Sequence, residues 1–240
     1  MRQLISIWAL IFNASLAVAD TVEFPEEELA TETVVPVFDR ARSVLNRTVD
    51  TTRRFELVAG LGIALNEPFF NPLNFNLNGT YYFTDLHAIN LSATMFMAGL
   101  TTYSDQLKRG EGLVPGQTFD ATLAPQPKMM ILGNYQFTAY YGKISLSKQT
   151  VMNLSLFGLA GAGIVQTGGL SNPALDVGFG QNFFFTPNLA ARFDLRLVMF
   201  NGPDPTSLNL ATGGVAPPEG AFAKALFFKT YLSLGASYIF

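Results

Sequence analysis

Apolar residues recur at every second position along most of this chain, from Arg53 onward. In residues 73–84 the odd positions are Leu, Phe, Leu, Gly, Tyr and Phe, whereas the even positions are Asn, Asn, Asn, Thr, Tyr and Thr. Successive side chains of a strand point to opposite faces, so one face here suits lipid and the other suits a polar interior. Eight segments share this pattern: 55–65, 73–84, 89–97, 129–139, 152–164, 175–185, 189–199 and 226–240. The pattern predicts an all-β fold, a transmembrane antiparallel up-and-down β-barrel of eight strands with an N-terminal periplasmic extension.

Two other architectures are compatible with parts of this pattern. A soluble β-sandwich also alternates, with its polar face outward. The expected signal peptide, the length of the strands and the aromatic C-terminal strand favour the membrane barrel, and only 14% of the residues are charged, against about 25% in soluble domains. Residues 151–165 can also be read as a transmembrane helix, although three glycines and the alternating polar residues favour a strand.

The N-terminal region divides into two parts that precede the barrel. Residues 1–19 resemble a secretory signal peptide, with Arg2, an apolar stretch at 4–12 and Ala17-Val18-Ala19 before an expected cleavage. A retained anchor is the alternative, but the stretch is shorter than the roughly 20 residues of a spanning helix. Residues 20–52 hold eight acidic and three basic residues, a net charge of −5. We therefore expect a signal peptide at 1–19, an acidic periplasmic leader at 20–52 and the barrel at 53–240.

The connections between the predicted strands differ in length. Four are long and rich in Gly, Pro and Asn, namely 66–72, 98–128, 166–173 and 201–223, whereas 85–87 and 186–188 are tight. Outer-membrane barrels have long external loops and short periplasmic turns, so a periplasmic N-terminus is expected. The fourth connection, at 141–150, is longer than a periplasmic turn should be, and the spacing does not explain it.

Several short motifs resemble a known family. They are Val35-Pro36-Val37-Phe38-Asp39, Leu45-Asn46-Arg47-Thr48-Val49, Arg54-Phe55-Glu56-Leu57, Tyr141-Gly142-Lys143-Ile144-Ser145-Leu146, Pro173-Ala174 before Val177-Gly178, and Arg192-Phe193-Asp194-Leu195-Arg196. In order and spacing they resemble small outer-membrane β-barrel proteins of predatory and gliding Gram-negative bacteria. The resemblance implies an outer-membrane barrel domain and supplies no biochemical activity. The terminal Phe240 on an alternating strand also resembles the signal that the outer-membrane assembly machinery reads.

The residue inventory argues against an enzyme. Barrel proteases, lipases and acyl transferases mostly need a histidine, and the single histidine, His87, is expected in a tight surface turn beside Asp85. The chain has no cysteine, and nothing in it predicts a transition-metal site, a cofactor site or a basic patch for nucleic acid. We expect no catalytic, cofactor-binding or metal-binding residues.

Charged residues are expected inside the barrel. The alternation turns six of them inward: Arg192, Asp194, Arg196, Asp176, Lys229 and Glu56. Side chains just fill the interior of an eight-stranded barrel, and buried charges must be paired. We expect a structural network of ion pairs, and the alternative is a conducting or ligand-binding lumen.

Function is expected to lie in the loops and the leader. Residues 34–49 are interpreted either as a plug at the periplasmic mouth, where Arg40, Arg42 and Arg47 meet acidic groups, or as a flexible linker. The loop at 98–128 carries Tyr103, Phe119 and several prolines, and loops of this kind carry recognition. The sequence predicts an outer-membrane scaffold with structural or interaction roles, in contact with lipid, with the assembly machinery and with protein partners. A small passive pore is the alternative.

Overall fold

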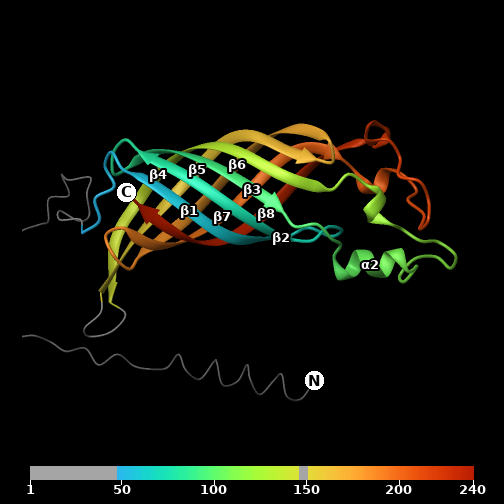
Figure 1. Cartoon of the computed structure of the whole chain (residues 1–240), viewed down its shortest axis with the longest axis horizontal. Helices are drawn as coiled ribbons and strands as arrows, with labels where there is room; N and C mark the ends of the chain where they lie inside the picture. The colour runs from blue at the N-terminus through green and yellow to red at the C-terminus, as the bar shows by residue number, and fades with distance from the viewer. Residues whose placement is uncertain (1–47, 146–150) are drawn as a thin grey trace, which may run out of the picture. The chain divides into compact units, whose positions relative to one another are not determined.

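The structure is a computed structural model, and it describes residues 48–145 and 151–240. The expected signal peptide and the leader up to residue 47 lie outside the described residues. Eight strands dominate the described part (Figure 1). They are β1 (Phe55–Ala64), β2 (Leu73–Tyr82), β3 (His87–Phe96), β4 (Pro127–Ser145), β5 (Val151–Thr167), β6 (Leu170–Phe184), β7 (Leu189–Pro203) and β8 (Lys224–Ile239). Between β3 and β4 lie helix α2 (Thr102–Lys108) and the short helix η3 (Ala121–Leu123), and between β7 and β8 lie η4 (Pro205–Ser207) and η5 (Glu219–Ala221).

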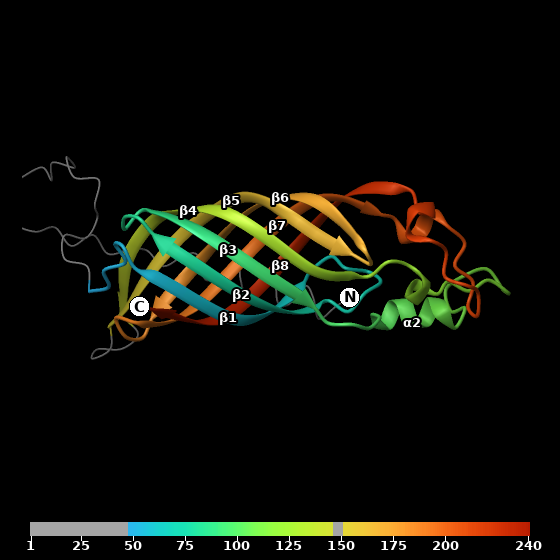
Figure 2. The same cartoon turned by 45° about the horizontal axis from the view of Figure 1, so that its top comes forward.

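Each strand pairs antiparallel with its neighbours in sequence, and the sheet closes on itself (Figure 2). Closure is made by β1 and β8, whose register runs from Glu56 opposite Ile239 to Ala64 opposite Tyr231. Closure pairs the backbone groups of both terminal strands, which hydrocarbon could not solvate. The predicted fold class, an eight-stranded up-and-down barrel, is confirmed.

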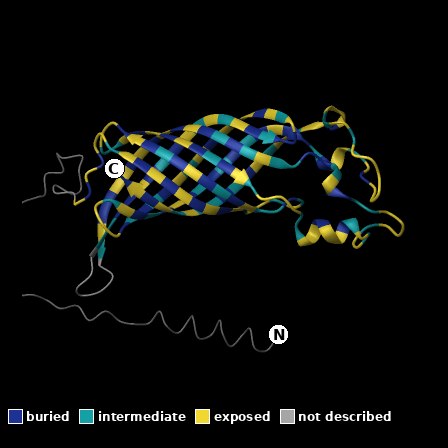
Figure 3. Cartoon of the chain, viewed as in Figure 1, coloured by how far each residue is buried: buried dark blue, intermediate teal, exposed yellow. Residues whose placement is uncertain are grey.

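The two faces of the barrel differ as the alternation predicts. In β1 every second residue is buried, so that Leu57 is 47% exposed and Val58 only 3%. Buried and exposed positions alternate over the whole wall (Figure 3). The outward residues are mainly Leu, Phe, Ile and Val, and the inward ones include many Asn, Thr and Ser. An apolar exterior around a polar interior is the arrangement of a barrel that spans a membrane.

One end of the barrel carries the long connections and the other the short ones. We call them the loop end and the turn end. The loop end carries L1 (residues 65–72), L2 (residues 97–126) and L4 (residues 204–223). The prediction of a long connection at 166–173 is wrong, because β5 and β6 continue to a two-residue turn, Gly168-Gly169. Gly168 has a φ of +63°, and tight hairpins need such a backbone at their first central residue.

The first half of the connection expected at 141–150 belongs to strand β4 of the barrel wall. Strand β4 runs to Ser145 and pairs with β5 as far as Val151, which leaves only residues 146–150 between the two strands. The register shifts between Thr138 and Tyr140, which marks a β-bulge there. Residues 151–165 form part of β5 and not a helix. Among the described residues, no helix is long and apolar enough to cross a membrane.

Candidate functional site: the filled lumen and the loop-end cap

A charged layer crosses the lumen, and Arg192 lies at its centre. The guanidinium donates from Nη1 to Glu56 Oε2 (3.1 Å), from Nε to Asp194 Oδ2 (3.1 Å) and from Nη2 to Gln136 Oε1 (3.1 Å). It also lies over the ring of Phe157, 4.2 Å from the centroid. The side chains of Arg192 and Glu56 are fully buried. A buried carboxylate and guanidinium are tolerated only when paired and hydrogen-bonded, as they are here.

The second half of this layer is centred on Arg196. Its Nη1 lies 3.9 Å from Asp176 Oδ2, its Nη2 lies 3.8 Å from Asp194 Oδ1, and Nη1 donates to Ser92 Oγ (3.0 Å). Asp194 therefore contacts both arginines. The structure brings five of the six predicted lumen residues together in one layer, in which three carboxylates face two guanidinium groups.

Lys229 lies outside that layer. Its Nζ lies 2.8 Å from Glu67 Oε2 and donates to the carbonyl of Asn66 (3.4 Å). Both partners belong to L1, which connects β1 and β2 at the loop end. Lys229 is therefore at the loop end of the lumen, separated from Arg192, and it fastens L1 over the barrel mouth. Sequence alternation could not reveal Glu67, because a loop residue has no strand face to assign.

An apolar layer lies on each side of the charged layer. Toward the loop end, a cluster of buried side chains fills the lumen with Phe96 and Phe227 packed against it: Ala64, Met130, Leu132, Val165, Ala174, Val198, Phe200 and Tyr231. Toward the turn end, a second cluster consists of Val49, Tyr141, Phe184, Ala190 and Ile239. Water and ions entering from either end would have to pass one of these apolar layers before they reached the charged layer around Arg192 and Arg196.

Glycine makes this tight filling feasible at one position. A Cβ on Gly180 would lie 2.4 Å from Cζ of Phe157. The absence of a side chain there leaves room for the ring on which Arg192 rests.

The last residues of the expected leader take part in the turn-end layer. Val49 is 2% exposed, and its backbone N–H donates to the hydroxyl of Tyr141 (3.2 Å). Thr52 Oγ1 donates to Asp85 Oδ1 (2.6 Å) in the turn between β2 and β3. Only Thr48 and Val49 of the predicted docking segment 34–49 are described, so its other residues, Arg40, Arg42 and Arg47 among them, lie outside the described part.

The loops L1, L2 and L4 form a folded cap with an apolar core of its own. Its buried members come from all three loops, and they are Phe70, Ala121, Ala124, Leu210 and Phe222. Backbone pairing fixes L1 to L2, with Asn71 N–H donating to Gly99 (3.0 Å) and Thr101 N–H donating to Phe69 (3.0 Å). We call these three loops the cap. Loops with a shared core present a defined surface.

One buried aspartate connects L2 and L4. The carboxylate of Asp120 lies 3.0 Å from Lys108 Nζ and accepts from the backbone N–H (3.0 Å) and hydroxyl (2.6 Å) of Thr122, while its own N–H donates to Leu210 (2.7 Å). Burial raises the pKa of Asp120, but the hydrogen bonds from Thr122 and Lys108 outweigh burial, so the pKa is lowered overall. The ionised form therefore stabilises the cap.

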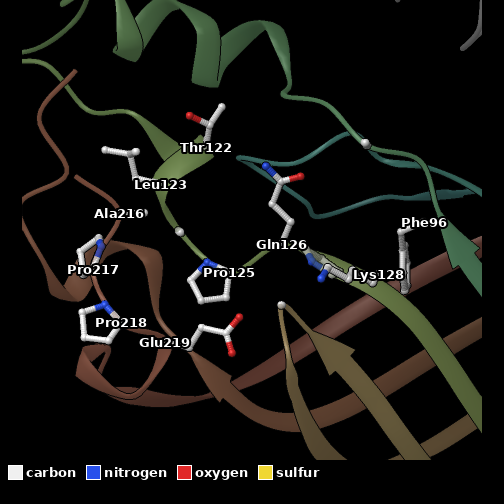
Figure 4. A pocket seen from close by; sticks show the side chains of 14 residues that line it. Phe96, Thr122, Leu123, Pro125, Gln126, Lys128, Ala216, Pro217, Pro218 and Glu219 are labelled. Carbon is white, nitrogen blue, oxygen red and sulfur yellow. The ribbon is translucent and has the colours of Figure 1, made fainter. Parts of the chain in front are cut away.

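A cavity of about 560 Å³ opens between the cap and the barrel rim (Figure 4). We call it the rim pocket. Its walls include four prolines, the ring of Phe96 and two oppositely charged side chains: Pro125, Pro127, Pro217, Pro218, Lys128 and Glu219. The carboxylate of Glu219 accepts from the N–H of Gly169 (2.8 Å), which fastens L4 to the turn between β5 and β6. Ligand pockets typically have volumes of about 300–1,000 Å³.

His87 lies at the turn end, away from this pocket. The expectation that it sits in a tight turn is wrong, because the turn occupies residues 83–86 and His87 begins β3 opposite Phe137. Its exposed ring lies beside those of Tyr135 (6.0 Å between centroids) and Phe137 (5.6 Å) on the outer wall. Among the described residues, no cluster of three or more His, Asp or Glu side chains could hold a metal ion.

The closed sheet, the apolar exterior and the polar, filled interior define an eight-stranded transmembrane β-barrel of the outer-membrane class. No protein-family model matches the chain, and no curated protein matches its sequence. The fold is similar to solved structures of small barrels at low sequence identity. The N-terminal barrel domain of Pseudomonas aeruginosa OprF is 10% identical over 79% of this chain and 98% of that one, with a TM-score of 0.39. The attachment invasion locus protein Ail of Yersinia pestis is 14% identical over 79% and 99%, with a TM-score of 0.32. A de novo designed transmembrane barrel is 8% identical over 79% and 97%, with a TM-score of 0.37.

Proposed function

We propose that this protein is an outer-membrane scaffold that acts by binding, through the cap on the cell surface and through its leader in the periplasm. The observation that carries the proposal is a folded cap above a filled lumen. A barrel that serves as a channel needs an open path, whereas here apolar layers enclose the charged layer. The cap, in contrast, has its own core and a pocket at its base.

The orientation and the compartments follow from the same proposal. With the loop end outside, the leader enters from the periplasm and residues 1–19 are removed as a signal peptide. Lipid surrounds the apolar wall, and the assembly machinery inserts the barrel. The resemblance to barrels of predatory and gliding bacteria remains a prediction. The proposed role involves no catalysis, and the one histidine, His87, packs beside two aromatic rings on the outer wall.

The leader is proposed to close the turn end as a plug. Val49 supports this proposal, since it is already packed into the turn-end layer with Tyr141, Phe184 and Ile239. Hydrogen exchange over residues 34–49 tests the plug: protection there is expected, and free exchange throughout would show a linker.

A passive pore is the second candidate, because charged groups line the middle of the lumen. Single-channel recording of the purified protein in planar bilayers separates the two candidates. We expect no steady conductance from the wild-type chain. Steady, ion-selective conductance would contradict the scaffold proposal and would support a pore.

The binding role has a separate test. A photo-crosslinking amino acid at Tyr103, an exposed residue of α2, is expected to capture a defined partner on intact cells. The matched control places the same group at Leu91, which faces lipid in β3, and is expected to capture lipid alone. Equal products from both positions, or none from Tyr103, would contradict binding through the cap.

A further inference from the structure

The rim pocket contains two opposite charges that do not neutralise each other. Lys128 lies at the start of β4, and Glu219 lies at the start of η5 in L4. Figure 4 shows them on two sides of the space, with Pro125 also at its wall. No ion pair joins them in the part of the chain that the structure describes. Both side chains therefore retain capacity for a ligand.

Each charge is held at the pocket in a different way. Glu219 uses Oε1 to accept from Gly169 N–H, and this bond fixes the carboxylate while Oε2 keeps its free lone pairs. The side chain of Lys128 makes no hydrogen bond or ion pair with residues 48–145 or 151–240, and the three N–H donors of its ammonium are available. An anchored carboxylate and an unpaired ammonium form a complementary pair for a molecule that carries both charges.

Much of the remaining wall is apolar, with Thr122 and Gln126 as its polar members. The ring of Phe96 packs against Tyr231 of the loop-end layer, with 5.7 Å between centroids. The proline rings have fixed φ angles, so Pro125, Pro217 and Pro218 lose little freedom when a ligand contacts them. A wall that is already ordered lowers the entropic cost of binding.

We propose that the rim pocket binds a small zwitterion, with its primary ammonium at Glu219 and its anionic group at Lys128. A simple anion would meet the carboxylate of Glu219, and a simple cation would meet the ammonium of Lys128, so each gains one attraction and one repulsion. A neutral sugar would leave both charges unneutralised. A zwitterion satisfies both, and its connecting carbons can lie on the proline and phenylalanine rings.

This chemistry has two sources at a cell surface. One is the phosphoethanolamine headgroup of a lipid, and the other is a short peptide with free termini. The inference builds on the proposed binding role of the cap, but it concerns a defined pocket and can be tested with the purified full-length protein in detergent micelles.

The test measures dissociation constants by calorimetry for glycerophosphoethanolamine and for the dipeptide glycyl-proline. Ethanolamine, glycerol 3-phosphate and maltose serve as the cationic, anionic and neutral probes. Binding of at least one zwitterion is expected, with each single-charge probe about fivefold weaker, the upper end for an ion pair open to solvent. A preference for the first zwitterion identifies a headgroup site, and a preference for the second identifies a peptide site.

Two variants locate the binding. Lys128→Gln and Glu219→Gln are each expected to weaken the zwitterion about fivefold, and the glutamine oxygen can still accept from Gly169. Lys224→Gln, at the start of β8, is the matched control and should leave the affinity unchanged, with circular dichroism verifying the fold of each variant.

The proposal is overturned if no zwitterion binds, if maltose binds as tightly as either zwitterion, or if the two variants bind like wild type. Such a result leaves the binding role of the cap standing when Tyr103 still captures a partner. Conversely, zwitterion binding without capture at Tyr103 would contradict the proposed partner of the cap and would still support the rim pocket as a binding site.

Discussion

Replacing Arg192 by methionine should destabilise the barrel more than any other single change in the lumen. Methionine keeps an unbranched side chain over Phe157 but removes the charge. Asp194 would keep Arg196 as a partner (3.8 Å), whereas Glu56, whose side chain is 0% exposed, would keep no ion pair within the described residues. Removing one partner of a buried ion pair costs about 3–5 kcal/mol, because the other charge stays buried without compensation. That is a large part of the roughly 5–15 kcal/mol that stabilises a typical folded protein.

A double-mutant cycle makes the reasoning specific to the pair. Glu56→Gln removes one negative charge and keeps one of the two oxygens that accept from Tyr82 and Ser237, while the other hydroxyl can accept from the new amide. The double variant with Arg192→Met should lose less stability than the two single variants together, by about 0.5–3 kcal/mol. An additive result would show that Glu56 and Arg192 are not coupled.

The assay is equilibrium unfolding by guanidinium chloride in lipid vesicles, followed by far-ultraviolet circular dichroism. Circular dichroism is preferred because the single tryptophan, Trp8, precedes the expected cleavage site. Arg109→Met is the control, since Arg109 and Glu111 form a pair whose side chains are more than half exposed, and its midpoint should not move. Arg192→Met within about 1 kcal/mol of wild type would refute the argument.

Three further predictions concern the cap and the turn end. The pKa of Asp120 is lowered in the folded protein, so its contribution to stability is present above the unfolded pKa of about 3.9 and is lost as the pH falls through the folded pKa. Acidification should therefore loosen the cap, which is measured as faster proteolysis of L2 near pH 3 than at neutral pH. The variant Asp120→Asn should be cleaved at the same rate under both conditions. Gly168→Ala should lower the free energy of unfolding by about 1–2 kcal/mol, because alanine is strained at a φ of +63° and its Cβ would meet the carboxylate of Glu219. Gly112→Ala is the control for backbone strain alone, since Gly112 has a φ of +80° and open space around it. Equal losses of stability in the two variants would contradict the contact with Glu219. Val49→Asp places a charge in the turn-end layer and should release residues 48–52 from it. The expected result is faster hydrogen exchange of these residues, with the melting temperature of the barrel unchanged. Thr52→Ala is the control and should leave the exchange at Val49 unaffected.

The alternation of residue types determined the wall of the barrel. A strand turns successive side chains to opposite faces, so Leu57 and Val58, or Leu77 and Asn78, could be assigned to lipid and lumen without any knowledge of their neighbours. The same rule placed Arg192, Asp194, Asp176 and Glu56 inside. The rule fails where strands end, which is why the turn at Gly168 and the extension of β4 to Ser145 were missed.

Only the tertiary structure decided which of the inward charges meet. Glu56 and Arg192 are far apart in sequence, and they share a layer because β8 lies between β1 and β7 in the closed sheet. Lys229 points inward by the same alternation, yet it lies near the loop end of β8, where the fold of L1 places Glu67 beside it. The cap and the rim pocket depend on contacts among loops, which carry no period that a sequence can display. A periodic pattern is local and can be read from the chain, whereas the level of a residue in a barrel and the packing of a loop are set by segments distant in sequence.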